Sequence, residues 1–168
     1  MSDTLHVLGR RTLIAAIGAL AGAGALPASP VREQRVVRRL RFDQRLAVVV
    51  AEGDFESEAI GSYSVRVYRV DTAARPDDET SFFAFGTVRP RDGSVDRVWR
   101  ADALRIGSAP ALVVSTRSAG RGRVLSADAF ELTSREIRLR ASVSGLRADA
   151  DPVAALARRL RRTAAAAK

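Results

Sequence analysis

Apolar and polar residues alternate along much of the chain with a period of two, the spacing that places side chains on one face of a β-strand. The alternation is clearest from 136 to 143, where Ile137, Leu139, Ala141 and Val143 are interleaved with Glu136, Arg138, Arg140 and Ser142. We expect the apolar set to face the interior and the polar set to face solvent. Alternation or short apolar runs predict further strands at 46–51, 62–70, 82–88, 95–101, 111–114 and 124–132.

Turn signals separate these segments. The sequence Pro90-Arg91-Asp92-Gly93 predicts a tight hairpin turn between two of the strands. About seven short strands divided by such turns are typical of an all-β sandwich or barrel.

The last segment, 150–168, changes to a helical period. Asp151 can cap a helix, and Pro152 suits its first turn. One face of the predicted helix is apolar (Val153, Leu156, Ala157, Leu160), and the other carries arginine (Arg158, Arg159, Arg161, Arg162). We favour a helix docked on the β-domain with its arginines in solvent. An arm that binds anionic lipid, cell-wall polymer or nucleic acid is the alternative.

The first 28 residues are typical of an export signal. Arg10 and Arg11 precede an apolar run, and Leu26-Pro27-Ala28 supplies a cleavage site with a small final residue. The paired arginines leave both the general secretory and the twin-arginine routes open. Residues 29–41 are rich in arginine and are expected to form a linker or a short helix, followed by a β-domain over 42–149.

Composition excludes several classes of enzyme. Cysteine is absent, and the single histidine, His6, lies within the predicted signal. The exported chain therefore cannot hold a Ser-His-Asp triad, a Cys-His pair or a zinc site built on these residues. Carboxylates cluster in 52–58 and 77–79, but both stretches look like solvated turns that would not separate two pKa values. No calcium-loop or phosphate-loop pattern is present. We expect no enzyme activity, no cofactor and no metal.

The net charge of +9 is unevenly distributed. Segment 42–149 has as many acidic as basic residues, so eight of the nine excess positive charges lie in the flanks 29–41 and 150–168. The flanks support a second hypothesis, in which an exported module binds anionic lipid or cell-wall polymer. Nucleic acid is not an expected partner of an exported protein.

A glycine-rich loop is predicted between the strands 111–114 and 124–132. Gly120 and Gly122 permit a sharply turned backbone, and Arg121 and Arg123 can form bidentate bonds with carboxylates. From spacing alone, an ordinary glycine-containing hairpin with solvated arginines is favoured over a loop that enters a cleft lined by acidic residues. The candidate binding residues in this loop are Ser118, Gly120, Arg121, Gly122 and Arg123.

Several stretches, in one order over about 46–157, resemble the family of periplasmic inhibitors of invertebrate-type lysozyme. They are Ala51-Glu52-Gly53-Asp54, Ile60-Gly61-Ser62-Tyr63-Ser64-Val65-Arg66-Val67-Tyr68, Arg89-Pro90-Arg91-Asp92-Gly93, Arg117-Ser118-Ala119-Gly120, Leu125-Ser126-Ala127-Asp128-Ala129-Phe130, Ala141-Ser142-Val143-Ser144-Gly145-Leu146 and Asp149-Ala150-Asp151-Pro152-Val153-Ala154-Ala155-Leu156. The resemblance implies a β-sandwich in the periplasm of a Gram-negative bacterium. Such a protein inhibits lysozyme by placing a loop in the active-site cleft.

The loop departs from the family pattern. That pattern is Ser-Gly-any-Tyr, and the corresponding stretch here is Arg121-Gly122-Arg123-Val124, in which only Gly122 matches. The hydroxyl groups that would bond to catalytic carboxylates are absent, and Arg121 could form charge-assisted bonds in their place.

Together these observations predict an antiparallel β-sandwich of about seven to eight strands with a short C-terminal amphipathic helix. We expect a periplasmic lysozyme inhibitor, or a diverged relative, whose partner is a lysozyme of the invertebrate type. Contact of the basic flanks with a membrane or cell wall, and a homodimer, stay open. Tyr63, Trp99 and Pro110 are expected to be structural.

Overall fold

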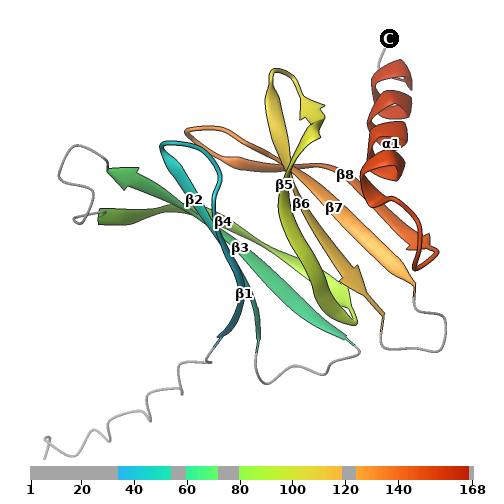
Figure 1. Cartoon of the computed structure of the whole chain (residues 1–168), viewed down its shortest axis with the longest axis horizontal. Helices are drawn as coiled ribbons and strands as arrows, with labels where there is room; N and C mark the ends of the chain where they lie inside the picture. The colour runs from blue at the N-terminus through green and yellow to red at the C-terminus, as the bar shows by residue number, and fades with distance from the viewer. Residues whose placement is uncertain (1–33, 54–59, 72–79, 119–123, 167–168) are drawn as a thin grey trace, which may run out of the picture. The chain divides into compact units, whose positions relative to one another are not determined.

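The computed structural model describes residues 34–53, 60–71, 80–118 and 124–166, which form eight strands and one helix (Figure 1). The predicted export signal, 1–28, lies outside the described residues. No helix in the described part of the chain is long and apolar enough to cross a membrane. The elements are β1 (Gln34–Arg41), β2 (Leu46–Gly53), β3 (Ile60–Asp71), β4 (Thr80–Asp92), β5 (Ser94–Ile106), β6 (Ala109–Arg117), β7 (Leu125–Leu132), β8 (Ile137–Leu146) and α1 (Pro152–Ala166).

The strands form two antiparallel sheets in chain order. Sheet A contains β1-β2-β3-β4, and sheet B contains β5-β6-β7-β8. The sequence-based expectation of a β-sandwich with a C-terminal helix is therefore confirmed. The expected hairpin at 90–93 is wrong, because β4 and β5 belong to different sheets and do not pair. Gly93 alone separates them and carries the chain from one sheet to the other.

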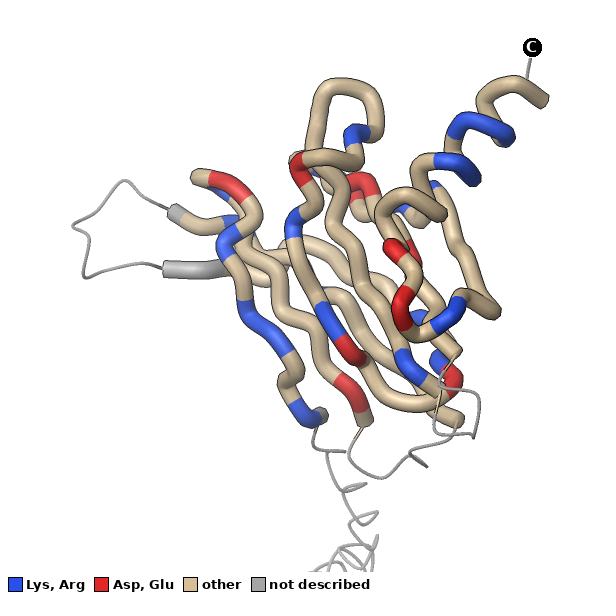
Figure 2. The backbone as a smooth tube through the Cα atoms, turned by 45° about the vertical axis from the view of Figure 1, so that its right-hand side comes forward, with Lys and Arg blue, Asp and Glu red and all other residues tan. Residues whose placement is uncertain are grey.

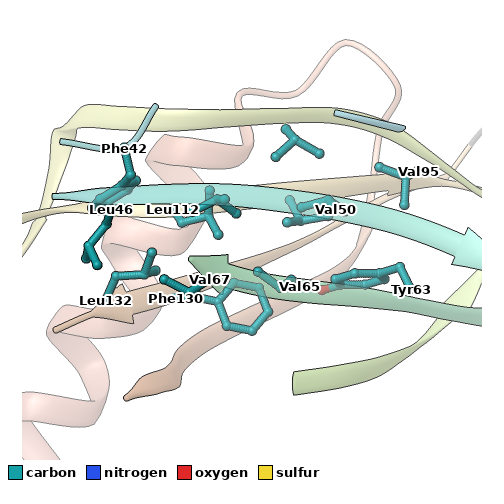
Figure 3. Close-up of a cluster of buried hydrophobic side chains, with 13 residues drawn as sticks. Phe42, Leu46, Val50, Tyr63, Val65, Val67, Val95, Leu112, Phe130 and Leu132 are labelled. Carbon is teal, nitrogen blue, oxygen red and sulfur yellow. The ribbon is translucent and has the colours of Figure 1, made fainter. Parts of the chain in front are cut away.

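The main core lies between the two sheets. Alternate residues of β2 and β3, such as Val48, Val50 and Val65, pack against Leu112 and Phe130 of sheet B. Each of these five side chains is buried, which is what two-fold alternation produces when two sheets stack face to face. In Figure 3, Tyr63 and Val95 lie at one end of this cluster, and Phe42, Leu46 and Leu132 lie at the other.

The segment expected to be a linker or a short helix contains a strand. Residues 34–41 pair with β2 along their whole length, so the β-domain begins before residue 42. The two-fold pattern is hidden by an irregularity in register between Val36 and Arg38. As a result Val37 and Leu40 pack against the core although their spacing does not alternate.

The C-terminal helix covers the outer face of sheet B. Leu156 is fully buried in a second cluster with Ala129 and Ala141, and Leu160 packs at its margin. The side chain of Asp151 caps the helix by accepting hydrogen bonds from the backbone N–H groups of residues 153 and 154, at 2.8 and 3.3 Å. The four helix arginines are exposed, so the docked arrangement favoured from the sequence is the one observed.

The expectation that β8 presents one apolar face is wrong in part. The register against β7 shifts between the pairs Ala129–Ala141 and Phe130–Leu139, which leaves Arg140 as an extra residue. A bulge of this kind reverses the faces on its two sides. Ala141 therefore packs under α1, Ile137 packs against the inter-sheet core, and Leu139 remains 39% exposed.

Candidate functional site

The loop singled out from the sequence is attached to the ends of β6 and β7. The backbone N–H of Ser118 donates to the carbonyl oxygen of Val124 at 2.9 Å, and the Val124 N–H donates to Ser118 Oγ at 3.3 Å. These two bonds close the loop at its base. Of the candidate residues, Ser118 is placed at this base, whereas Gly120, Arg121, Gly122 and Arg123 lie outside the described residues.

Arg117, the last residue of β6, is directed toward the neighbouring strand β5. Its Nε and Nη2 atoms lie 2.9 and 3.3 Å from the two carboxylate oxygens of Asp96. The hydrogen bond to this carboxylate, together with its charge, raises the pKa of the Arg117 guanidinium. The pair links the end of β6 to β5 where the chain leaves the sheet.

Gly93 lies beneath the loop base. A Cβ atom at this position would be 1.8 Å from the carbonyl oxygen of Arg117 and 2.5 Å from the Cα of Ser118. Its φ angle of 77° also falls in the left-handed region that favours glycine. The chain can therefore cross between the sheets directly against the loop base only without a side chain at residue 93.

A buried carboxylate holds this crossing in place. Glu52 is 2% exposed, and its Oε1 lies 3.5 Å from Nε of Arg91, which is also buried. Glu52 accepts a hydrogen bond from the backbone N–H of Val95 and pairs with Arg35. The expectation that Glu52 belongs to a solvated turn is wrong, because β2 extends through it to Gly53. The rest of that acidic cluster, 54–58, lies outside the described residues.

A second polar network joins β7 to its neighbour β8 and to β3 and β4 of the opposite sheet. Asp128 accepts hydrogen bonds from the hydroxyl of Tyr63 at 2.6 Å and from that of Ser142 at 2.5 Å, and Arg89 Nε lies 3.3 Å away. Burial raises the pKa of the Tyr63 phenol, and the Asp128 charge raises it further. The hydroxyl therefore remains a donor at physiological pH. A cavity of about 230 Å³ opens beside the network, between sheets A and B.

No pattern in the sequence indicates this network. Tyr63 is expected from the sequence to be structural, and its burial at 1% exposure agrees with that view. The partner of its hydroxyl lies 65 residues away, however, and no local pattern connects the two positions. Only the packing of the two sheets brings Tyr63 and Asp128 together.

The charged side chains around the loop base pair with one another. Among the described residues, no group of three or more histidine, cysteine, aspartate or glutamate side chains could hold a metal ion. The carboxylates near the loop, Asp96, Glu52 and Asp128, are each paired with arginine. The Arg117–Asp96 pair links β6 to β5, and Asp128 links β7 to β8 and to β3, so both strands from which the loop extends are held by side-chain contacts.

The chain is similar to known proteins in both sequence and fold. The family model of the periplasmic lysozyme inhibitor of I-type lysozyme matches residues 34–160. The crystal structure of such an inhibitor from Aeromonas hydrophila is similar, with 38% identity, a TM-score of 0.61, and coverage of 71% of this chain and 97% of that one. The Aeromonas hydrophila inhibitor in complex with Meretrix lusoria lysozyme is also similar, with 37% identity, a TM-score of 0.61, and coverage of 71% and 93%. No curated protein matches the sequence.

Proposed function

Because the chain belongs to the family of periplasmic lysozyme inhibitors of I-type lysozyme, we propose that it binds a lysozyme of this type and blocks its active-site cleft. The family match over 34–160 carries this proposal, since it spans both sheets and the strands on either side of the loop. The inhibitor in complex with Meretrix lusoria lysozyme supports the same class of partner.

We assign the blocking role to the loop 118–124. Two observations support the assignment: the loop is closed at its base by the bonds between Ser118 and Val124, and the crossing at Gly93 packs beneath it. A loop whose ends are held together by hydrogen bonds loses less entropy when it enters a cleft than a loop whose ends are not joined.

In this proposal, arginine side chains take the place of the serine and tyrosine hydroxyl groups of the family pattern. Arg121 and Arg123 face the acidic groups of the lysozyme cleft and form charge-assisted hydrogen bonds with them. Val124, at the position of the family tyrosine, supplies no hydroxyl; its backbone closes the loop base. Binding then depends on the charge of two guanidinium groups, and the chain needs no enzyme activity of its own.

The test is a pair of double variants with equal loss of charge. Arg121→Ala/Arg123→Ala is expected to weaken inhibition of an I-type lysozyme by at least about 100-fold. This estimate takes a loss of about 1.5–3 kcal/mol of binding free energy for each hydrogen bond to a charged group. The control is Arg45→Ala/Arg135→Ala, which removes two exposed arginines from turns at the opposite end of the sandwich.

The readout is the inhibition constant in a cell-wall lysis assay, together with the thermal unfolding temperature of each variant. The control is expected to inhibit as the parent chain does. Equal potency of the two double variants would contradict the role assigned to the loop arginines, and inhibition by the parent chain would still support the family function.

A further inference from the structure

The outer face of sheet A has no element packed over it in the described part of the chain. The outer face of sheet B is covered by α1, through Leu156 and its neighbours (Figure 1). In sheet A, Val48 and Val50 of β2 point into the core, so Val49 between them points outward. The outward residues of the other strands follow from their register against β2.

Two arginines flank Val49 on this face. Arg39 of β1 and Arg66 of β3 are both paired in register with Val49, one on each side. Residues directly opposite in a sheet share a face, so the two guanidinium groups emerge on either side of a small apolar side chain. Neither Arg39 nor Arg66 forms an ion pair within the described residues.

An aromatic pair lies beside these arginines. In the next row, Arg41, Ala47, Tyr68 and Phe83 are register partners across the four strands. The rings of Tyr68 and Phe83 meet edge to face, with centroids 5.9 Å apart. Arg41 is held at this edge of the sheet by bonds to the carbonyl oxygens of Asp43 and Gln44.

Apolar side chains on the same face are unusually exposed. Phe83 is 62% exposed, and Val88 of β4, the register partner of Ser64, is 66% exposed. A groove of about 630 Å³ lies over β1–β3, lined in part by Arg39, Arg66 and Tyr68. We call this surface the sheet A face and define it by Arg39, Arg41, Arg66, Tyr68, Phe83 and Val88. Figure 2 shows basic positions along β1, in blue, and others along α1.

We propose that the sheet A face binds the surface of a membrane containing anionic phospholipid. Arginine is attracted to lipid phosphate, and aromatic rings favour the boundary between headgroups and acyl chains. The sheet A face offers both on one flat surface, whereas the exposed side of α1 offers arginine without exposed aromatic residues. The proposal concerns a surface separate from the loop 118–124 and does not depend on lysozyme inhibition.

The positive charge of the sheet A face favours an anionic membrane surface over a second copy of the chain as its binding partner. Stacking two sheet A faces would bring the arginines of both copies together, and like charges brought into one interface are destabilising. The acidic residue that lies outward on the described part of β4, Asp92, is at the far end of the strand, beyond Val88 and Pro90. A soluble anionic polymer would satisfy the arginines but would leave Phe83 and Val88 in water.

The experiment uses the chain purified from the periplasm and two kinds of vesicle, one of phosphatidylcholine alone and one containing phosphatidylglycerol. Cosedimentation is expected only with the anionic vesicles and is expected to weaken with added salt. Arg39→Ala/Arg66→Ala should bind about 30-fold more weakly, as expected for the loss of two arginines near an anionic surface. Phe83→Ser should also weaken binding, without a change in charge.

The matched control is Arg158→Ala/Arg161→Ala, which removes the same charge from exposed positions on α1. This variant is expected to bind vesicles as the parent chain does, and circular dichroism checks the fold of every variant. Equal weakening by the α1 pair would overturn the proposal in favour of the helix. Absence of vesicle binding, or a dimer in sedimentation that Phe83→Ser abolishes, would overturn it as well.

Discussion

Gly93 shows how one residue without a side chain determines the geometry of the candidate binding loop. The chain crosses from sheet A to sheet B at this residue, directly against the backbone of Arg117 and Ser118. The crossing is tied to the sandwich by the buried pair of Glu52 and Arg91. The position of the loop base therefore depends on residues outside the loop itself.

Replacing Gly93 by alanine is expected to lower the free energy of unfolding by about 2–4 kcal/mol, because a left-handed φ is unfavourable and the new Cβ meets backbone atoms. Gly107 provides the control, since its φ of 63° is similar but no atom lies within 4 Å of the position that a Cβ would occupy there. Gly107→Ala should therefore cost only about 1–2 kcal/mol. Urea unfolding measures both variants, and equal losses would show that the contact with Arg117 is unimportant.

Among the elements, seven strands were predicted from local patterns because each either alternates or forms a short apolar run. The eighth, β1, was not, because the register irregularity near Val37 breaks its alternation and arginine fills most of the remaining positions. The bulge at Arg140 had a similar effect on β8, because the side chains change to the other face of the sheet there although the sequence alternates regularly. Irregular pairing is a property of two strands and is not encoded in the periodicity of either one.

The helix α1 contributes to stability through one fully buried leucine. Leu156→Ala should lower the free energy of unfolding by about 2–5 kcal/mol, since it leaves a cavity between α1 and sheet B. Leu160 lies at the margin of the same cluster, so Leu160→Ala should cost distinctly less. Comparable losses from the two variants, measured by urea unfolding, would contradict a docking contact centred on Leu156.

Across the whole molecule, the segments that bear on binding differ in how well they could be identified from the sequence. The strands that flank the loop 118–124 were expected at 111–114 and 124–132, and β6 and β7 are observed at Ala109–Arg117 and Leu125–Leu132. Binding by the loop itself stays a prediction. The networks around Glu52 and Asp128 were not found, because each includes a partner far away in the sequence and in the opposite sheet: Val95 for Glu52 and Tyr63 for Asp128. The basic flank 29–41 was expected to be separate from the domain, yet 34–41 is a strand whose Arg39 belongs to the sheet A face.

Inhibition of a lysozyme of the invertebrate type is the activity on which the role of the loop depends. It is tested by titration of the purified chain against invertebrate-, chicken- and goose-type lysozymes in a cell-wall lysis assay. We expect stoichiometric loss of lysis with the invertebrate-type enzyme and no comparable loss with the other two. Undiminished lysis by invertebrate-type lysozymes at a several-fold molar excess of the folded chain would show that the chain is not an inhibitor of this class.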